Sequence, residues 1–284
     1  MASDVELLEV FRLGEAARDE RVVRVAGDRL ADRWLGVSRF REVADLAARS
    51  LEVQVSAGTL TQAGQAKALL GRGTAALLDH EQALAITREV GDRAGEATAL
   101  SNIGGVYHGW GDGDTALTHF EQALPICREV GDRAGEAAAL NNIGLVHDQR
   151  GEGDTALTYL EQALPIRREV GDRAGEAVTL SNIGMVYFGR GEGDTALTNY
   201  NLALPIRREV GDRAGEATTR YMIAAVLRAN GQLAGAVAQL ELVVELDRAV
   251  EHPDLESDAA MLDQVRAELS AHNQLTPTKP SHSY

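Results

Sequence analysis

A repeat of 40 residues constrains the fold of this chain more than any other sequence feature. The string Gly-Asp-Arg-Ala-Gly-Glu-Ala begins at Gly91, Gly131, Gly171 and Gly211. Residues 91–130 and 131–170 differ at only 11 of 40 positions. Repetition at this period is typical of solenoids, in which each unit buries its apolar face against its neighbours. Positions that differ between near-identical copies are therefore residues that have a different function in each copy, or no function.

Each copy is expected to fold into two helices. Small and apolar residues recur three or four apart in two segments, at Leu100, Ile103, Gly104 and Tyr107 and again at Ala116, Phe120 and Ala123. This spacing places them on one helical face. Gly111 and Asp112 separate the segments, glycine supplying a positive φ and aspartate a helix cap. Two such helices cannot bury their apolar stripes alone, so the copies should stack.

These residues resemble the tetratricopeptide repeat. The 40-residue length and the Gly-Asp-Arg-x-x-Glu link are similar to the longer repeats of Pins-type adaptors and kinesin light chains, and bacterial regulators and signalling NTPases carry comparable arrays. The resemblance implies an all-α fold, a right-handed superhelical solenoid of antiparallel helix pairs. It also implies a non-catalytic adaptor that binds an extended peptide or partner protein in a concave groove.

The array is expected to extend beyond the four clear copies. The predicted divisions are degenerate N-terminal helices in 1–51, a worn repeat in 52–90, repeats in 91–130, 131–170, 171–210 and 211–250, a capping helix in 251–272 opened by Pro253, and a disordered tail in 273–284.

The resemblance places the first helix of each copy on the concave side. In Pins-type adaptors and kinesin light chains, asparagines matching Asn102, Asn142 and Asn182 grip the ligand main chain, and an amide can both donate and accept hydrogen bonds. The other groove candidates are Ser101, Asn141, Ser181, Tyr221, Leu145 and Met185, with His108, Asp148, Phe188 and Arg228 on a rung that varies between copies. Alternatively, the asparagines are copied residues bonded within the array or to water, and the variable rung reflects drift.

Comparison of the copies also predicts individual environments. Gly104 should sit where two helix backbones approach closely, and Pro125 lies inside a second helix, where it should bend the helix. Cys127 and His119 align with polar residues of later copies and should be exposed. Gly153 stands where these repeats usually have an aromatic residue that wedges against the neighbouring helix. Its absence should loosen the packing at the turn between the two helices.

The charges argue against several partners. Arg93 and Glu96 should form a solvated ion pair that stabilises the helix by about 0.2–0.5 kcal/mol. Alternatively, Arg93 reaches the groove edge and holds an acidic ligand. The groove candidates lack the basic residues of carboxylate-clamp cochaperones. A net charge of −15 argues against nucleic acid as a partner.

Composition and motifs argue against a catalytic function. Cys127 is the only cysteine, so no disulfide or thiolate zinc site is expected, and the seven histidines form no HExxH motif. No phosphate-binding loop, signal peptide or membrane span is evident. The sequence predicts a protein without enzyme activity, cofactor or metal, in the cytoplasm. Two lysines, Lys67 and Lys279, beside abundant arginine suggest a GC-rich bacterial gene.

Two further function classes stay open at this stage. The array could be a peptide-sensing module of a bacterial transcription regulator or signalling NTPase. It could also be a scaffold that assembles with copies of itself through exposed repeat edges.

Overall fold

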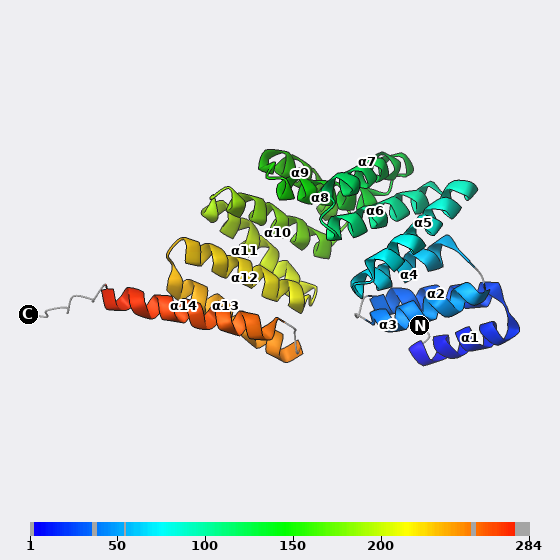
Figure 1. Cartoon of the computed structure of the whole chain (residues 1–284), viewed down its shortest axis with the longest axis horizontal. Helices are drawn as coiled ribbons and strands as arrows, with labels where there is room; N and C mark the ends of the chain where they lie inside the picture. The colour runs from blue at the N-terminus through cyan, green and yellow to red at the C-terminus, as the bar shows by residue number, and fades with distance from the viewer. Residues whose placement is uncertain (1–2, 36–38, 54, 251–253, 276–284) are drawn as a thin grey trace, which may run out of the picture. The chain divides into compact units, whose positions relative to one another are not determined.

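The computed structural model describes residues 3–35, 39–53, 55–250 and 254–275. Every regular element within these ranges is an α-helix, and the described residues contain no β-strand (Figure 1). This confirms the all-α repeat fold built from helix pairs. The helices form two compact units, residues 1–149 and residues 150–284.

The described helices follow one another through short connections. The first unit contains α1 (Asp4–Ala17), α2 (Glu20–Leu35), α3 (Phe40–Val53), α4 (Ala57–Leu69), α5 (Gly73–Val90), α6 (Arg93–Gly109), α7 (Gly113–Val130) and α8 (Arg133–Gln149). The second contains α9 (Gly153–Glu169), α10 (Arg173–Gly189), α11 (Gly193–Glu209), α12 (Arg213–Ala229), α13 (Leu233–Val250) and α14 (Leu255–Leu275).

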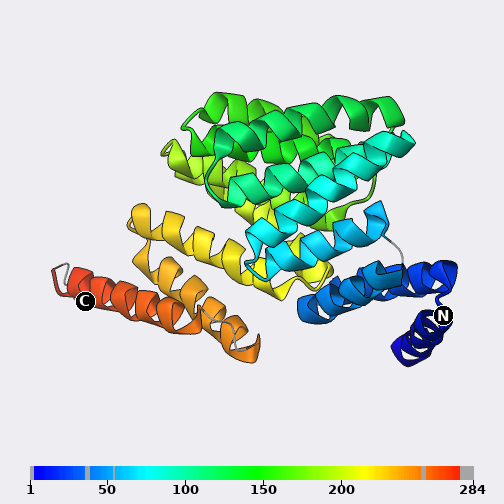
Figure 2. The ribbon, with the colours of Figure 1, turned by 45° about the vertical axis from the view of Figure 1, so that its right-hand side comes forward.

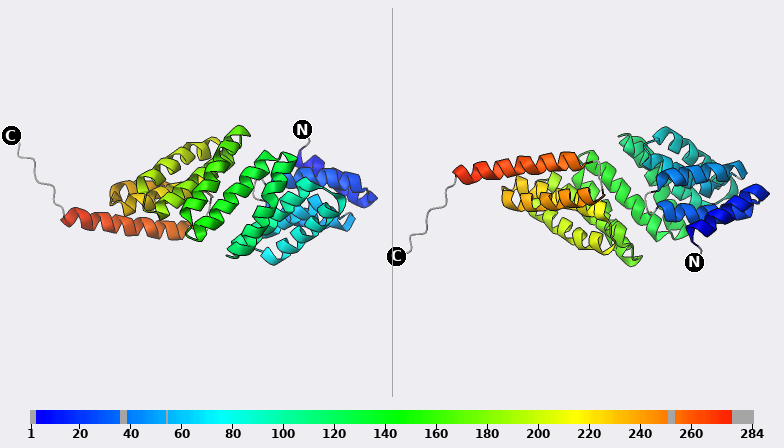
Figure 3. Two further views of the ribbon diagram at one scale, coloured as in Figure 1. Left: turned by 90° about the horizontal axis from the view of Figure 1, so that it is seen from above. Right: turned by 90° about the horizontal axis from the view of Figure 1, so that it is seen from below.

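Within each unit, every helix packs against the next along the chain. In the first unit, α4 pairs with α5 and α6 with α7, while α5 also contacts α6 and so joins the pairs (Figure 2). In the second, α10 pairs with α11 and α12 with α13. α14 lies alongside α13 and covers its apolar side, with Leu262 and Val265 buried (Figure 3).

The predicted turn chemistry is confirmed. Gly91 and Gly111 have φ of 73° and 78° at the ends of α5 and α6. The Asp112 carboxylate accepts a hydrogen bond from the backbone N–H of Thr115 at 3.1 Å and caps α7. Since glycine adopts positive φ without steric cost and aspartate satisfies an orphan N–H, the boundary between α6 and α7 is specified locally. Glu152 and Glu192, which precede α9 and α11, make no such side-chain cap.

The glycine on the apolar stripe makes room for a ring, not for a neighbouring backbone. A methyl group added to Gly104 would stand 2.7 Å from Cε1 of the buried Phe120. Gly184 faces Tyr200 in the same way, at 2.8 Å from Cε1. The expectation of backbone contact at Gly104 was wrong because the aromatic residue of the second helix lies directly over the glycine.

We predict that Gly104→Ala destabilises the first unit, whereas Gly105→Ala does not. Both glycines lie inside α6, and an added Cβ at Gly105 would meet nothing within 4 Å. Alanine favours the helix by up to about 1 kcal/mol at either position, but crowding Phe120 costs about 1–3 kcal/mol. Thermal melting should show a lower midpoint for Gly104→Ala only. Equal midpoints for the two variants would contradict this account.

Two side chains expected on the surface are not exposed. Cys127 is 2% exposed, and burial raises the pKa of its thiol to about 11. Its position faces the start of the next helix, and Arg167, which stands there in the next copy, is itself mostly covered and paired with Asp172. His119 is half-buried because its ring stacks on Tyr107, with centroids 5.8 Å apart.

The structure also shows the surroundings of the predicted prolines, of Gly153 and of the C-terminal helix. Pro125 lies inside α7, as predicted, and Pro165 and Pro205 lie at the equivalent positions inside α9 and α11. The space at the Gly153 corner is lined by Val186 and Arg190, so side chains of the next helix take part of the place of the absent aromatic. α14 runs to Leu275, three residues into the segment expected to be disordered; Pro253 and residues 276–284 lie outside the described residues.

The Gly-Asp-Arg-x-x-Glu link forms an ion network between helices. Glu96 is buried and receives hydrogen bonds from Arg93 and, at 2.9 Å, from Nε of Arg88. Arg93 also binds Glu129 of the following helix at 2.9 Å. Arg173 repeats this arrangement with Glu176 and Glu209. These arginines therefore connect successive helices, which is more than the expected solvated pair and leaves the acidic-ligand alternative without support.

We predict an acid-dependent loss of stability from this network. The Arg88 hydrogen bond, assisted by Arg93, lowers the pKa of Glu96 below its ordinary value of 4.5. A carboxyl with a depressed pKa stabilises the fold at neutral pH, and this contribution declines below pH 4.5 and is lost as pH falls through the lowered pKa. Glu96→Gln should cost about 1 kcal/mol at pH 7.

Melting curves of wild type and Glu96→Gln at pH 7 and pH 3.5 check this prediction. The midpoints should differ at pH 7, and the difference should be smaller at pH 3.5. Glu121→Gln, which changes an exposed carboxylate on α7, is the matched control and should match wild type at both values. A Glu96→Gln deficit that is independent of pH would refute the electrostatic explanation.

Candidate functional site

A groove in the first unit collects several of the predicted binding residues. It has a volume of about 730 Å³ and is lined mainly by α4, α6 and α8, the first helices of successive pairs. Ser101, Asn102 and Asn142 all line it, together with Gln65 of α4. The structure thus brings two of the three predicted asparagines of the ladder into one groove.

Two polar atoms at this groove have no hydrogen-bond partner among the described residues. They are Nδ2 of Asn102 and Nδ1 of His80, both shielded from solvent by surrounding side chains. Buried polar atoms are nearly always paired in folded proteins, because an unpaired one costs about 1–3 kcal/mol. Asn102 and His80, which both line the groove, therefore each carry one unsatisfied polar atom.

His80 was missed by the sequence analysis. It is 1% exposed and lies over Gly64, the position that Phe120 takes over Gly104. Burial lowers the pKa of the imidazole to about 4, so the ring is neutral at physiological pH. A signal was available, because His80 stands where the following copies have Phe120, Leu160, Tyr200 and Leu240.

An ion pair stands beside His80. Lys67 of α4 donates to the buried Asp79 of α5 at 2.5 Å. Asp79 raises and Lys67 lowers the pKa of His80, but desolvation outweighs both. Because the two charges compensate each other, the neighbourhood of His80 carries no net charge to attract an ion.

Trp110 supplies an exposed aromatic surface at the groove. Its side chain is about half-exposed, packs over Gly73 and meets the Tyr107 ring edge-on with centroids 5.5 Å apart. The later copies have arginine or asparagine at this position, and the worn copy has Leu70. An exposed tryptophan held in place by a neighbouring ring is typical of residues that anchor a partner.

The remaining candidates of the first unit do not line this groove. Asn141 is buried, and its Nδ2 donates to Oδ1 of Asn142 at 3.4 Å. His108 and Asp148 are half-buried; burial lowers the pKa of His108 and raises that of Asp148. Leu145 is half-buried as well.

The candidates of the second unit have other surroundings. The Ser181 hydroxyl donates to the carbonyl of Ala177, and Phe188 packs on the core around Tyr200. Asn182 and Met185 are half-buried and line none of the described pockets. Arg228 binds Glu268 of α14 through two hydrogen bonds of 3.0 and 2.5 Å. Tyr221 lines a separate pocket between α12, α13 and α14.

Two further searches of the described residues bear on the site. None of the helices there is long and apolar enough to cross a membrane. Within the same ranges, no three His, Cys, Asp or Glu side chains are grouped to hold a metal ion.

Solved structures share this fold at low sequence identity. BtubC from P. vanneervenii has a TM-score of 0.60 at 22% identity, over 79% of this chain and 91% of that one. The Rap conjugation gene regulator of plasmid pLS20, solved with the Phr* peptide, gives 0.65 at 15%, over 95% and 80%. A STAND ATPase with a tetratricopeptide repeat sensor from Pyrococcus horikoshii gives 0.68 at 14%, over 92% and 41%.

Sequence comparison identifies the family. No curated protein sequence matches the chain. The tetratricopeptide repeat model matches residues 55–129, 97–169 and 175–249, which is more than half of the chain and includes α4 to α13. The chain therefore belongs to the tetratricopeptide repeat family.

Proposed function

We propose that the chain is a non-catalytic binding protein that holds an extended peptide in the groove of its first unit. The observation that carries this proposal is the pair of unpartnered polar atoms, Nδ2 of Asn102 and Nδ1 of His80, at one groove of about 730 Å³. Tetratricopeptide folds commonly mediate peptide and protein interactions, and the fold likeness to Rap solved with the Phr* peptide favours a peptide as the occupant.

The polar groups at the groove match a peptide main chain. Each peptide unit offers one carbonyl acceptor and one N–H donor. The Asn102 amide can donate to a carbonyl, and the neutral His80 can accept from an N–H when its proton is on Nε2. Asn142 and Gln65 add two more amides to the same groove. Such groups bind a backbone whatever its sequence.

Side-chain preference would come from the apolar part of the groove. Trp110, Leu69 and Val106 line it beside the amides. Burying an apolar ligand side chain against such surface contributes about 25 cal/mol per Å². We therefore expect the bound peptide to carry an apolar residue opposite Trp110.

Asn102→Asp tests the main-chain contact. The full chain would be panned against a phage-displayed library of random peptides, and one selected peptide labelled for fluorescence anisotropy. The variant keeps the shape of Asn102 but replaces its N–H₂ donor with a carboxylate oxygen, which repels a carbonyl. The affinity should fall about tenfold or more, since a buried hydrogen bond is lost.

The matched control is Asn201→Asp, which makes the same change at an exposed position of α11. It should bind the peptide as wild type does. Failure to select any peptide, or equal binding by Asn102→Asp and wild type, would disprove the proposed groove.

His80→Phe separates binding from folding. The variant copies the arrangement of Phe120 over Gly104 and removes the unpaired nitrogen, so the melting midpoint should stay or rise. Anisotropy should show weaker binding of the same selected peptide, because an acceptor is lost. A raised midpoint with unchanged affinity would show that His80 serves the core alone.

The peptide-sensor alternative would use the same groove. The Rap regulator and the STAND ATPase share the fold and carry regulatory roles in their own names. The two functions differ in whether occupation of the groove changes the activity of an attached or bound effector. Hydrogen exchange of the chain with and without the selected peptide distinguishes them: protection confined to α4, α6 and α8 favours an adaptor, and changes that spread through both units favour a sensor.

A further inference from the structure

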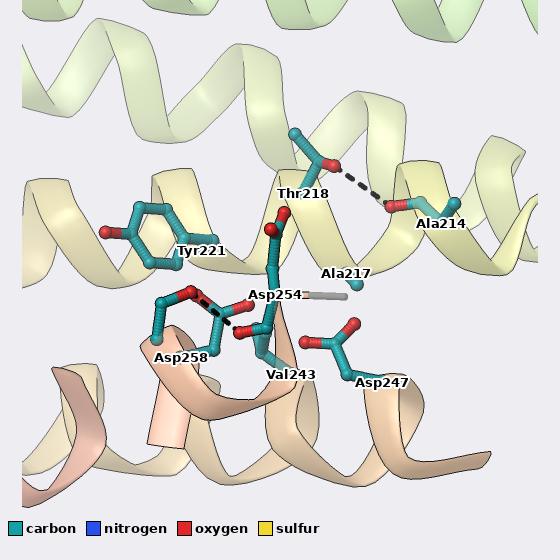
Figure 4. A pocket seen from close by; sticks show the side chains of 9 residues that line it. Ala214, Ala217, Thr218, Tyr221, Val243, Asp247, Asp254 and Asp258 are labelled. Atoms are coloured by element: carbon teal, nitrogen blue, oxygen red, sulfur yellow. Dashed lines mark hydrogen bonds between the residues drawn. The ribbon is translucent and has the colours of Figure 1, made fainter. Parts of the chain in front are cut away.

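The second unit contains a pocket lined by acidic residues that the groove does not involve. Its volume is about 390 Å³, and it lies between α12, α13 and α14 (Figure 4). Asp247 comes from α13, Asp254 precedes α14 and Asp258 lies in its first turn, while Tyr221 and Thr218 come from α12. No Lys, Arg or His is among the residues that line it in the described part of the chain.

Asp247 is the unusual member of this set. Its side chain is 3% exposed, and its Oδ2 is buried without a hydrogen-bond partner among the described residues. In Figure 4 its carboxylate points into the space beneath α12, and the Asp254 carboxylate extends towards Thr218 of α12. A buried carboxylate oxygen without a partner is costly, because it has left water without a compensating donor.

The repeat register shows that Asp247 replaces a basic residue. Forty and eighty residues earlier stand Arg207 and Arg167, which bind the helix-capping carboxylates of Asp212 and Asp172. In these copies a cation from the second helix pairs with an acid at the start of the next helix. In the last copy an acid takes the place of the arginine, and the position in register with Asp212 is residue 252, which lies outside the described residues.

Two of the three hydroxyl groups of the pocket donate their protons to backbone carbonyls. Thr218 donates to the carbonyl of Ala214 at 3.0 Å, and Ser257 donates to the carbonyl of Asp254 at 2.8 Å. The Thr218 and Ser257 oxygens and the ionised carboxylates then act as acceptors, and the Tyr221 hydroxyl can either donate or accept. A primary ammonium group has three donors and no acceptor, and a guanidinium group has five donors, so both match this lining. The Tyr221 ring adds an aromatic wall that favours cations.

We propose that this pocket binds one organic cation, an ammonium or guanidinium group carried by a basic side chain or by a free amine. An organic cation is favoured over a metal ion because the described acidic side chains are not grouped as metal ligands. The proposal does not depend on the groove of the first unit, since the two sites lie on different helices.

Nuclear magnetic resonance of the full chain tests the pocket with defined probes. N-acetyl-lysine methylamide presents a side-chain ammonium, N-acetyl-arginine methylamide a guanidinium, and glycinamide a terminal ammonium. N-acetyl-norleucine methylamide has the hydrocarbon chain without the charge. The cationic probes should produce saturable shifts of amide signals in α12, α13 and α14, and the norleucine probe should not. The relative affinities show which source of cation the pocket prefers.

Two variants link the shifts to Asp247. Asp247→Asn keeps the shape and removes the charge, and should weaken binding of the lysine probe about tenfold. Asp247→Arg, which restores the residue type of Arg207, should abolish binding because the chain then supplies its own guanidinium. Asp194→Asn, at an exposed position on α11, should bind as wild type does. Melting curves of all three establish that they fold.

Three outcomes would overturn the proposal. They are equal shifts with the norleucine probe, undiminished binding of the lysine probe by a folded Asp247→Asn variant, and displacement of the lysine probe by millimolar Ca²⁺ or Mg²⁺ acting at the same amides. The first two would make the pocket a passive feature of the cap, and the third would make it a metal site.

Discussion

The contact between a glycine of the first helix and a ring of the second is the interaction on which three of the helix pairs depend. Gly64, Gly104 and Gly184 leave the space that His80, Phe120 and Tyr200 fill, so the two helices of a pair can approach while their apolar faces exclude water. A pair alone leaves one apolar side open, and the next pair in the unit covers it. The glycine turns, aspartate caps and arginine–glutamate links then fix where each helix begins and how it connects to its neighbour.

Near-identity of the copies makes the departures informative. His80 puts an imidazole where other copies have apolar core residues, and Asp247 puts a carboxylate where two copies have arginine. Each substitution leaves a buried polar atom without a partner, which opposes folding. Both residues line a concavity, one in the first unit and one in the second. A cost to stability at two such places is understandable if each contributes to binding.

Much of the fold was predictable because its determinants are local. The spacing of Leu100, Ile103 and Tyr107 defines a helical face, and Gly111 and Asp112 end one helix and begin the next. The environments of single side chains were harder to predict. Cys127 and His119 align with polar residues, yet they are buried or half-buried, because a long side chain such as Arg167 can occupy the same covered position by extending its charged end to a partner. An alignment of residue types does not show how deeply the side chain at each position is buried.

The sequence by itself determined the all-α repeat fold, the 40-residue period and the asparagines Asn102 and Asn142 as groove residues. These follow from periodicity and from family resemblance, which depend on neighbours a few residues apart or one copy away. Only the tertiary structure decided which candidates share a groove and which polar atoms lack partners. Asn141 turned inward, Arg228 paired with Glu268, and His80 came to lie beside Asn102 in the groove lining. These outcomes depend on contacts between helices, where burial and hydrogen bonding are settled by residues distant in the chain.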